Sequence, residues 1–343
     1  MSTAVRGTTE HPADGAGEVL LRAVDVVKHF PVGHGSLRRR DRPVVHAVDG
    51  VSLEVRAGET LGVVGESGCG KSTLGRCLTR LTDVTSGRIE LAGRDISTLS
   101  RRQLRPIRRD VQMVFQDPYA SLNPRRRVGD IVAEPLIVHG YGGKGAIARR
   151  VEELFGVVGL AASHTDRYPH EFSGGQRQRV GIARALAMSP QLIVADEPVS
   201  ALDVSIQAQV LNLLLDLRAE LGLTYVLISH DLAVVERVSD RIAVMYMGRI
   251  MEHGPVGGVY ADPQVPYTYA LLSARPTVPG RERYSRVILP GDVGEPGAVR
   301  QGCPFAPRCW MAADVCRQSM PELRETRPGH WAACHFPGEM EQR

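Results

Sequence analysis

The sequence predicts an α/β fold whose central sheet is parallel and whose ligand site lies at one end of that sheet. Three short apolar runs have the length of buried strands, and each ends in polar residues suited to phosphate or metal binding. The runs are residues 61–64, 192–195 and 225–229, and they end in Gly65, in the pair Asp196 and Glu197, and in His230. Parallel sheets bind ligands beyond the carboxyl ends of their strands, so these residues are expected to meet.

The first strand leads into a glycine-rich loop that fits the phosphate-loop pattern G-x-x-x-x-G-K-[ST]. The loop consists of Gly65, Glu66, Ser67, Gly68, Cys69, Gly70, Lys71, Ser72 and Thr73. Apolar residues then recur at helical spacing at Leu74, Cys77, Leu78 and Leu81, which completes the strand–loop–helix context of the motif. A glycine-rich turn could match by accident, but lysine occurs only at Lys28, Lys71 and Lys144, which disfavours that reading.

This loop predicts a nucleotide site. Its glycines let backbone N–H groups surround a polyphosphate at the positive end of a helix. Lys71 would reach the β- and γ-phosphates of ATP, and the Ser72 hydroxyl would take a coordination position of Mg²⁺. ATP and Mg²⁺ are therefore the expected cofactors.

The other strand ends carry groups that hydrolysis of ATP requires. Asp196 is placed to hold Mg²⁺ through water, and Glu197 could polarise an attacking water. Gln116 follows the apolar run 111–115, where it could meet the metal and sense the γ-phosphate. A single histidine is usually structural, but the position of His230 at a strand end favours a role at the ligand.

Two further features bear on nucleotide binding. Phe30 could stack on an adenine ring, and a place in the core is the alternative. A second anion-binding helix start is predicted at Ser173, Gly174, Gly175 and Gln176, because serine and glycine at a helix start leave N–H groups available. A capping role alone is the other reading of Ser173.

The amino-acid composition limits the classes of protein to which the chain can belong. The 343 residues carry a net charge of +4 and only 5% aromatic residues, so aliphatic side chains must fill the core. Arginine runs at 38–40, 101–109 and 125–127 could face phosphate, lipid or an acidic partner, or be solvated surface. The first 17 residues lack the apolar core of a signal peptide and are expected to be disordered. No stretch has 18 uncharged apolar residues, so no membrane span is expected.

With these elements in this order, the chain resembles the ATPase subunit of an ABC transporter over about residues 18–255. The matching motifs are the phosphate loop 65–73, the Q-loop Gln116, the signature 172–176, the Walker B residues Asp196 and Glu197, the D-loop Asp203 and the switch histidine His230. Residues 116–125 and 195–209 look like the oligopeptide/dipeptide importer branch. The loop 65–72 and the segment 173–179 are most similar to its second, F-type ATPase subunit.

The resemblance implies a P-loop NTPase ABC cassette, with a RecA-like core, an antiparallel β subdomain and an inserted helical subdomain at about 119–180. The cassette would occupy residues 18–258, after the disordered residues 1–17. A small C-terminal domain of the oligopeptide-transporter type, containing a four-cysteine motif, would follow at 259–343.

The resemblance also implies a head-to-tail dimer that sandwiches ATP. Each ATP would lie between the phosphate loop, Phe30, Gln116, Glu197 and His230 of one chain and Ser173, Gly174, Gly175, Gln176 and Asp203 of the other. Glu197, His230 and Gln116 would serve catalysis, and Ser72, Gln116 and Asp196 would hold Mg²⁺.

The implied partners are a second ATPase subunit of the D type, two transmembrane permease subunits and, indirectly, an extracytoplasmic solute-binding protein. The chain would sit peripherally at the cytoplasmic face of the membrane, where residues 119–124 and the helical subdomain would receive the permeases. Peptides are the expected cargo. Nickel, glutathione or a small glycosylated solute is the alternative.

Four cysteines crowd the C-terminus, namely Cys303, Cys309, Cys316 and Cys334. A reducing cytosol disfavours disulfides, and the spacing lacks the paired C-x₂₋₄-C of a zinc ribbon. In the family that the chain resembles, this cysteine pattern is associated with a [4Fe–4S] cluster. Zinc and free or oxidised thiols remain the alternatives.

Two functions outside transport are also open. A soluble ABC ATPase acting on ribosomes or nucleic acid usually has two cassettes or a long coiled coil, and this chain shows neither, so no nucleic acid is expected. A phosphoryl-transferring kinase would not need the signature helix at residues 172–176.

Overall fold

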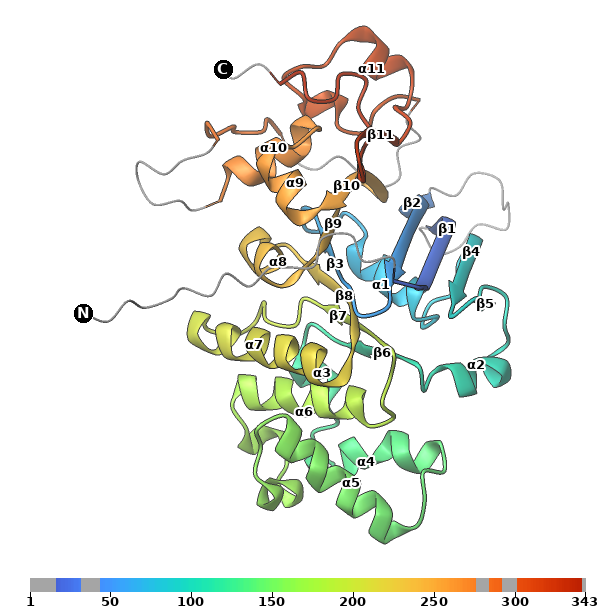
Figure 1. The fold of residues 1–343 in the computed structure, drawn as a ribbon, viewed down its shortest axis with the longest axis vertical. Coiled ribbons are helices and arrows are strands. Elements are labelled where there is room, and N and C mark those ends of the chain that lie inside the picture. Colours follow the sequence, from blue (N-terminus) through green and yellow to red (C-terminus); the bar gives the residue numbers. More distant parts are fainter. Residues whose placement is uncertain (1–16, 32–43, 276–283, 292–300, 341–343) are drawn as a thin grey trace, which may run out of the picture.

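The computed structural model describes residues 17–31, 44–275, 284–291 and 301–340 (Figure 1). The predicted disordered N-terminus falls almost entirely outside these ranges. The arginine run 38–40 also lies outside the described residues.

The central sheet has eight strands, and its middle is built from buried apolar runs. Its order is β11 (Arg324–Arg327), β12 (His330–Ala332), β10 (Arg249–Pro255), β9 (Arg241–Tyr246), β3 (Thr60–Val64), β8 (Thr224–Ser229), β7 (Leu192–Asp196) and β6 (Val111–Val114). The five strands from β9 to β6 are parallel, and β3, β7 and β8 are buried along their whole length. The predicted parallel sheet is therefore confirmed.

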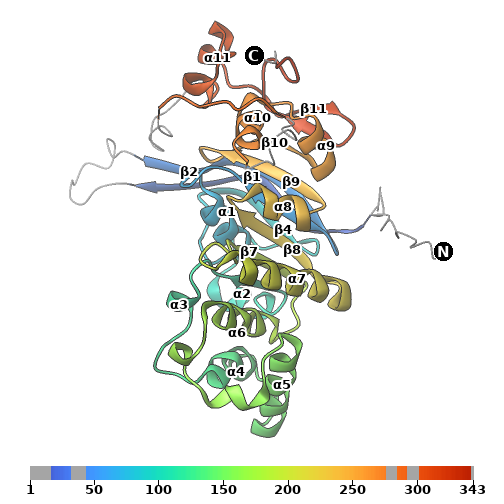
Figure 2. The same cartoon turned by 90° about the vertical axis from the view of Figure 1, so that its left-hand side faces the viewer.

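Helices cover this sheet and follow its strands. They are α1 (Lys71–Leu78), α7 (Val204–Leu221), α8 (Leu232–Val238), α9 (Val256–Ala261) and α10 (Pro266–Ser273). The α7 helix ends at Gly222, whose φ of 64° is the left-handed conformation that often terminates a helix. The helices α7 and α8 lie on one side of the parallel strands, and α1 lies on the other side, toward the second sheet (Figures 1 and 2).

The second sheet is antiparallel and lies on one side of the central sheet. Its order is β2 (Val44–Arg56), β1 (Val19–Pro31), β4 (Ser86–Leu91) and β5 (Arg94–Asp95). The short helix α2 (Arg101–Ile107) follows, capped by Ser100 and Gln103. This sheet packs its apolar face on α1 and on one face of the central sheet, in a single cluster that contains Leu21, Val51 and Leu74.

A group of helices forms the far end of the molecule (Figure 2). Its members are α3 (Pro118–Ser121), α4 (Val128–Val138), α5 (Lys144–Val157), η1 (Ala162–Asp166), η2 (Pro169–Glu171) and α6 (Gly174–Leu186). Val132, Leu136 and Phe155 are fully buried between α4, α5 and α6. The sequence indicates the helix of α5 from Ile147. It begins three residues earlier, at Lys144, where no apolar residue marks the start.

The C-terminal region contains η3 (Ala306–Arg308) and α11 (Asp314–Gln318). It packs against the cassette. Its strand β12 pairs with β10 and so extends the central sheet. Phe305 packs against Tyr246 and Tyr267, with ring centroids 5.4 and 5.3 Å apart. The region in which the sequence predicts a small C-terminal domain therefore shares its sheet and its core with the cassette.

A buried carboxylate fastens this junction. Glu252 of β10 is fully buried and accepts hydrogen bonds from the backbone N–H groups of Gln264 and Val265. His330 Nε2 lies 2.7 Å from Glu252 Oε1 and is itself 3% exposed. The sequence offered no signal for this pair.

Candidate nucleotide site

The ends of β1, β3, β7 and β8 surround a cavity of about 580 Å³. Its lining includes Phe30, residues 67–73 of the phosphate loop, Gln116, Glu197 and His230. Segments separated by up to 200 residues in sequence therefore meet at one place, as the strand-end pattern predicts.

The loop's glycines are required by its close fit against neighbouring backbone. Gly70 has a φ of 106°, and a Cβ there would lie 1.9 Å from the carbonyl oxygen of Ala47. A Cβ on Gly65, whose φ is 154°, would lie 2.1 Å from the carbonyl oxygen of Met245. Any other residue at these positions would displace the loop from β2 or β9.

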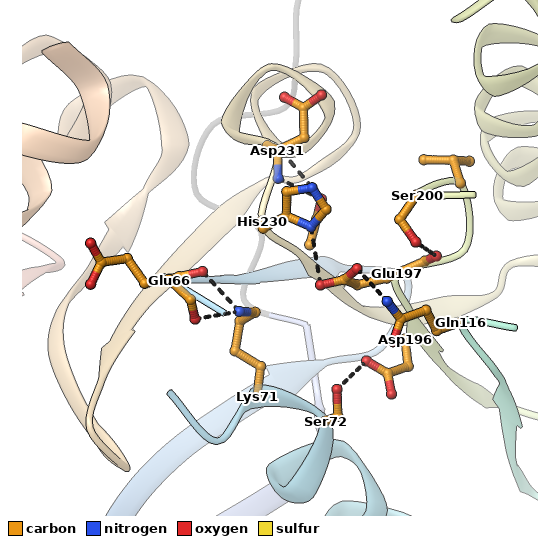
Figure 3. Close-up of polar contacts among 12 residues, drawn as sticks. Glu66, Lys71, Ser72, Gln116, Asp196, Glu197, Ser200, His230 and Asp231 are labelled. Carbon is orange, nitrogen blue, oxygen red and sulfur yellow. Dashed lines mark hydrogen bonds and ion pairs between the residues drawn. The ribbon is translucent and has the colours of Figure 1, made fainter. Parts of the chain in front are cut away.

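Lys71 is folded back over this loop. Its side chain is buried, and Nζ donates to the carbonyl oxygens of Gly65 at 2.8 Å and Glu66 at 2.9 Å (Figure 3). The ammonium group is thus held at the loop by two neutral acceptors. Phosphate oxygens carry more negative charge than these carbonyls and would compete for it.

Ser72 and Asp196 meet across α1 and β7. The Ser72 hydroxyl donates to Asp196 Oδ1 at 2.8 Å, and Asp196 is 2% exposed. Burial raises the pKa of Asp196, and the nearby Glu197 carboxylate raises it further, whereas the hydrogen bond from Ser72 lowers it. A hydroxyl beside a buried carboxylate is an oxygen donor set that suits Mg²⁺.

Glu197 is held at both carboxylate oxygens. Gln116 Nε2 donates to Oε2 at 2.8 Å, and His230 Nδ1 lies 3.1 Å from Oε1 (Figure 3). The Glu197 backbone has a φ of 45°, in the left-handed region that a glutamate rarely adopts. Its N–H donates to the carbonyl of Ile228 at 2.9 Å, which fixes this turn to β8. The arrangement orients one carboxylate toward the cavity.

Phe30 also lines this cavity. Its side chain is exposed, and Lys28 Nζ lies 4.8 Å from the ring centroid. The alternative that Phe30 is a core residue is therefore wrong. The sequence did not indicate the nearby pair His29 and His46, whose ring centroids lie 3.9 Å apart with the ring planes tilted by 38°.

The predicted signature lies away from this cavity. Ser173 caps α6, accepting from Gln176 N at 3.3 Å while Gln176 Oε1 accepts from Ser173 N at 3.0 Å. A Cβ on Gly175 would lie 2.4 Å from Ile206 Cγ2 of α7, so glycine is required there for packing. Asp203 precedes α7 as its N-cap. None of these residues lines the cavity around Lys71.

The four C-terminal cysteines line one small apolar cavity of about 20 Å³, together with Met251 and Phe305. Burial raises the pKa of the Cys309 and Cys334 thiols to about 11. Among the described residues, no group of three or more metal-ligating atoms within 4.8 Å of one another includes these sulfurs. The four side chains share this cavity, and no three of their sulfurs all lie within 4.8 Å of one another.

An ion pair that the sequence did not reveal joins this C-terminal region to the phosphate loop. Arg308, next to Cys309, pairs with Glu66 at 2.6 Å between Nη1 and Oε2. The hydrogen bonds to Glu66 raise the pKa of Arg308, so the guanidinium stays charged.

Comparison with known proteins agrees with this geometry. The family model described as "ABC transporter" matches residues 48–200, and the one described as "Oligopeptide/dipeptide transporter, C-terminal region" matches residues 251–316. The chain is 51% identical to the oligopeptide transport ATP-binding protein AppF of Bacillus subtilis (strain 168), over 93% of this chain and 98% of that protein. It is 48% identical to the di/tripeptide transport ATP-binding protein DppF of Pseudomonas aeruginosa (strain UCBPP-PA14), with the same coverage.

Solved structures give the same fold. A dimeric, post-hydrolysis form of the ATP-binding cassette MJ0796 bound to ADP and Pi superposes with a TM-score of 0.61 at 30% identity, over 69% of this chain and 98% of that one. Cassette CbiO1 of Clostridium perfringens has a TM-score of 0.61 at 28% identity, over 71% and 91%. Among the described residues, no helix is both long and apolar enough to cross a membrane. The chain belongs to the ABC transporter ATP-binding proteins, in the oligopeptide/dipeptide transporter branch that includes AppF and DppF.

Proposed function

We propose that this protein is the ATP-hydrolysing subunit that energises import of peptides across the cytoplasmic membrane. The observation that carries the proposal is the Glu197 carboxylate, held by Gln116 at 2.8 Å and by His230 at 3.1 Å beside the phosphate loop. A fixed carboxylate next to a γ-phosphate position is what activation of water requires.

The residues of the cavity divide the work of hydrolysis. Lys71 exchanges its two loop carbonyls for the β- and γ-phosphates as ATP enters. Ser72, Asp196 and Gln116 would hold Mg²⁺, which supplies charge neutralisation at the phosphates when bound. Glu197 accepts a proton from the attacking water, and His230 keeps the carboxylate aimed. Phe30, which lines the cavity with its side chain exposed, would stack on the adenine.

A second chain would complete each site. Ser173 to Gly175 lie outside their own chain's cavity. The helix start that they form would contact the γ-phosphate held by a partner. Gln176 and Asp203 would flank that contact. The similar cassette MJ0796 was solved as a dimer. We expect a D-type ATPase as partner, giving a heterodimer.

Peptide cargo and membrane partners follow from the relatives' names. AppF is an oligopeptide transport protein and DppF a di/tripeptide transport protein. The dimer would dock on two permease subunits at the cytoplasmic face, fed by an extracytoplasmic solute-binding protein. Tyr119, 64% exposed at the start of the helical group, would contact a permease. Nucleic acid has no part in this scheme.

Uptake by the whole complex tests this function. Vesicles holding the chain, a D-type ATPase and both permeases, with ATP on the nucleotide-binding side, should import a labelled peptide when its binding protein is present. Phosphate should be released without any phosphorylated acceptor, which excludes a kinase. Uptake of nickel or glutathione in place of every peptide tried would refute the peptide assignment while keeping the ATPase.

We further propose that Cys303, Cys309, Cys316 and Cys334 hold a [4Fe–4S] cluster with a structural role. All four line one cavity, which fits four thiolate ligands. A tetrahedral zinc ion with Zn–S bonds of about 2.3 Å would draw its sulfurs to about 3.8 Å of one another, and these sulfurs are not gathered that closely.

Metal analysis of protein purified without oxygen tests the cluster. We expect brown protein with about four iron and four sulfide per chain, and loss of the colour in Cys309→Ser. The matched control is Cys77→Ser, since Cys77 is a buried thiol far from the cavity in sequence and packed in the other core cluster. Colourless protein containing one zinc and no iron would replace the cluster by the zinc alternative.

A further inference from the structure

The C-terminal region contacts the phosphate loop through the Arg308 side chain. Its guanidinium donates to both carboxylate oxygens of Glu66, at 2.6 Å from Nη1 to Oε2 and 3.0 Å from Nη2 to Oε1. The Arg308 side chain is 9% exposed, and 242 residues separate the two partners in sequence. Such a two-pronged contact fixes direction as well as distance.

Glu66 is held through three of its own groups, which are its backbone N–H, its carbonyl oxygen and its side-chain carboxylate. Its backbone N–H donates to Tyr267 Oη at 2.9 Å, and its carbonyl oxygen accepts from Lys71 Nζ at 2.9 Å. Its side chain points away from Lys71 (Figure 3), toward Arg308. The position of Glu66 therefore bears directly on the position of the lysine that meets the phosphates.

The C-terminal anchor is itself rigidly placed. Arg308 ends η3, directly before Cys309, and its Nη1 also lies 3.4 Å from Tyr246 Oη. Phe305, at the start of the same turn, packs on Tyr246 and Tyr267. The side chains that hold Glu66 thus belong to one packed unit.

We propose that Arg308 is a positioning residue of the ATP site, through which the C-terminal region keeps the phosphate loop in its nucleotide-binding shape. This inference rests on the proposed ATPase function. Without Arg308, the Glu66 carboxylate would be left half-buried and unpaired. It would regain water only by moving outward, and that movement would displace the Glu66 carbonyl that places Lys71.

A double-mutant cycle in the full chain tests the inference. Arg308→Met is expected to raise the dissociation constant for Mg·ATP about 3- to 30-fold, the range of a strong local coupling. Adding Glu66→Gln should restore affinity to within about threefold of wild type, because a neutral amide needs no counter-charge. A role in folding alone would lower the unfolding free energy of Arg308→Met without changing the ATP affinity of the folded protein.

Steady-state kinetics provide an independent readout. The KM for ATP should rise in Arg308→Met while kcat changes less than about threefold, because Glu197 keeps its own contacts. Arg317→Met is the matched control, since Arg317 is an exposed arginine of the same region that pairs only locally with Asp314. Its ATP affinity should equal that of wild type.

The outcomes separate this inference from the proposed function. Wild-type protein that fails to bind ATP would remove the proposed function. Wild-type binding with Arg308→Met unchanged, or with no recovery in the double variant, would overturn the role of Arg308. If Arg308→Met does not fold, the ATP affinity of the double variant is compared with that of Glu66→Gln alone. Equal affinities support the role of Arg308, and a tenfold difference contradicts it.

Discussion

Replacing Glu197 by glutamine is expected to lower ATP hydrolysis by about 10²- to 10⁴-fold, the usual contribution of a general base. The amide keeps the size of the side chain and a contact with Gln116 or His230, but it cannot accept the proton of the attacking water. Nucleotide binding should persist, because the phosphate-binding groups are untouched. Phosphate release and ATP affinity, measured on the same preparation, check both parts.

Two further variants frame this result. Lys71→Ala should weaken ATP binding itself, because Lys71 is the cation at the phosphate loop. Glu236→Gln, on an exposed glutamate that pairs with Arg275, should leave both quantities unchanged. Hydrolysis at a tenth of wild type or more in Glu197→Gln would remove Glu197 from the catalytic role.

The Glu252→Ala variant is expected to lose about 3–5 kcal/mol of unfolding free energy, the cost of removing one partner of a buried pair. The substitution leaves His330 and the N–H groups of Gln264 and Val265 without their acceptor in the interior. Urea denaturation should show a lower midpoint. Glu54→Ala is the matched control, since Glu54 is an exposed strand residue paired with Arg22.

The expected loss for Glu54→Ala is under about 1 kcal/mol, because solvent screens an exposed pair. Equal midpoints for the two variants would show that Glu252 does not fasten the C-terminal region to β10. A loss confined to one of two separate transitions would locate the effect in that region.

The nucleotide site could be predicted from the sequence because each of its parts is local. The phosphate loop, the residues Asp196 and Glu197 and the histidine His230 each follow a buried apolar run, and parallel pairing of those runs brings them together. Phe30 remained ambiguous, because a single aromatic residue carries no sign of whether it faces solvent or core.

The contacts that involve the C-terminal region could not be predicted in this way. Arg308 and Glu66 are 242 residues apart, and no sequence pattern around either residue indicates that the two form a pair. The pairing of β12 with β10 joins a three-residue strand to the cassette, which is too short for periodicity to reveal. The sequence therefore indicated a C-terminal domain but not that its strands extend the central sheet.

Light scattering of Glu197→Gln, mixed with a D-type ATPase partner, tests most directly the claim that two chains share each ATP. We expect separate subunits without nucleotide and a heterodimer when Mg·ATP is added, because Ser173 to Gly175 of one chain need the γ-phosphate held by the other. Ser173→Arg should abolish that association without changing ATP affinity of the isolated chain. Two results together would contradict the claim that two chains share each ATP. They are a chain that stays monomeric at saturating ATP and a wild-type chain that, alone, hydrolyses ATP at the full rate of the complex.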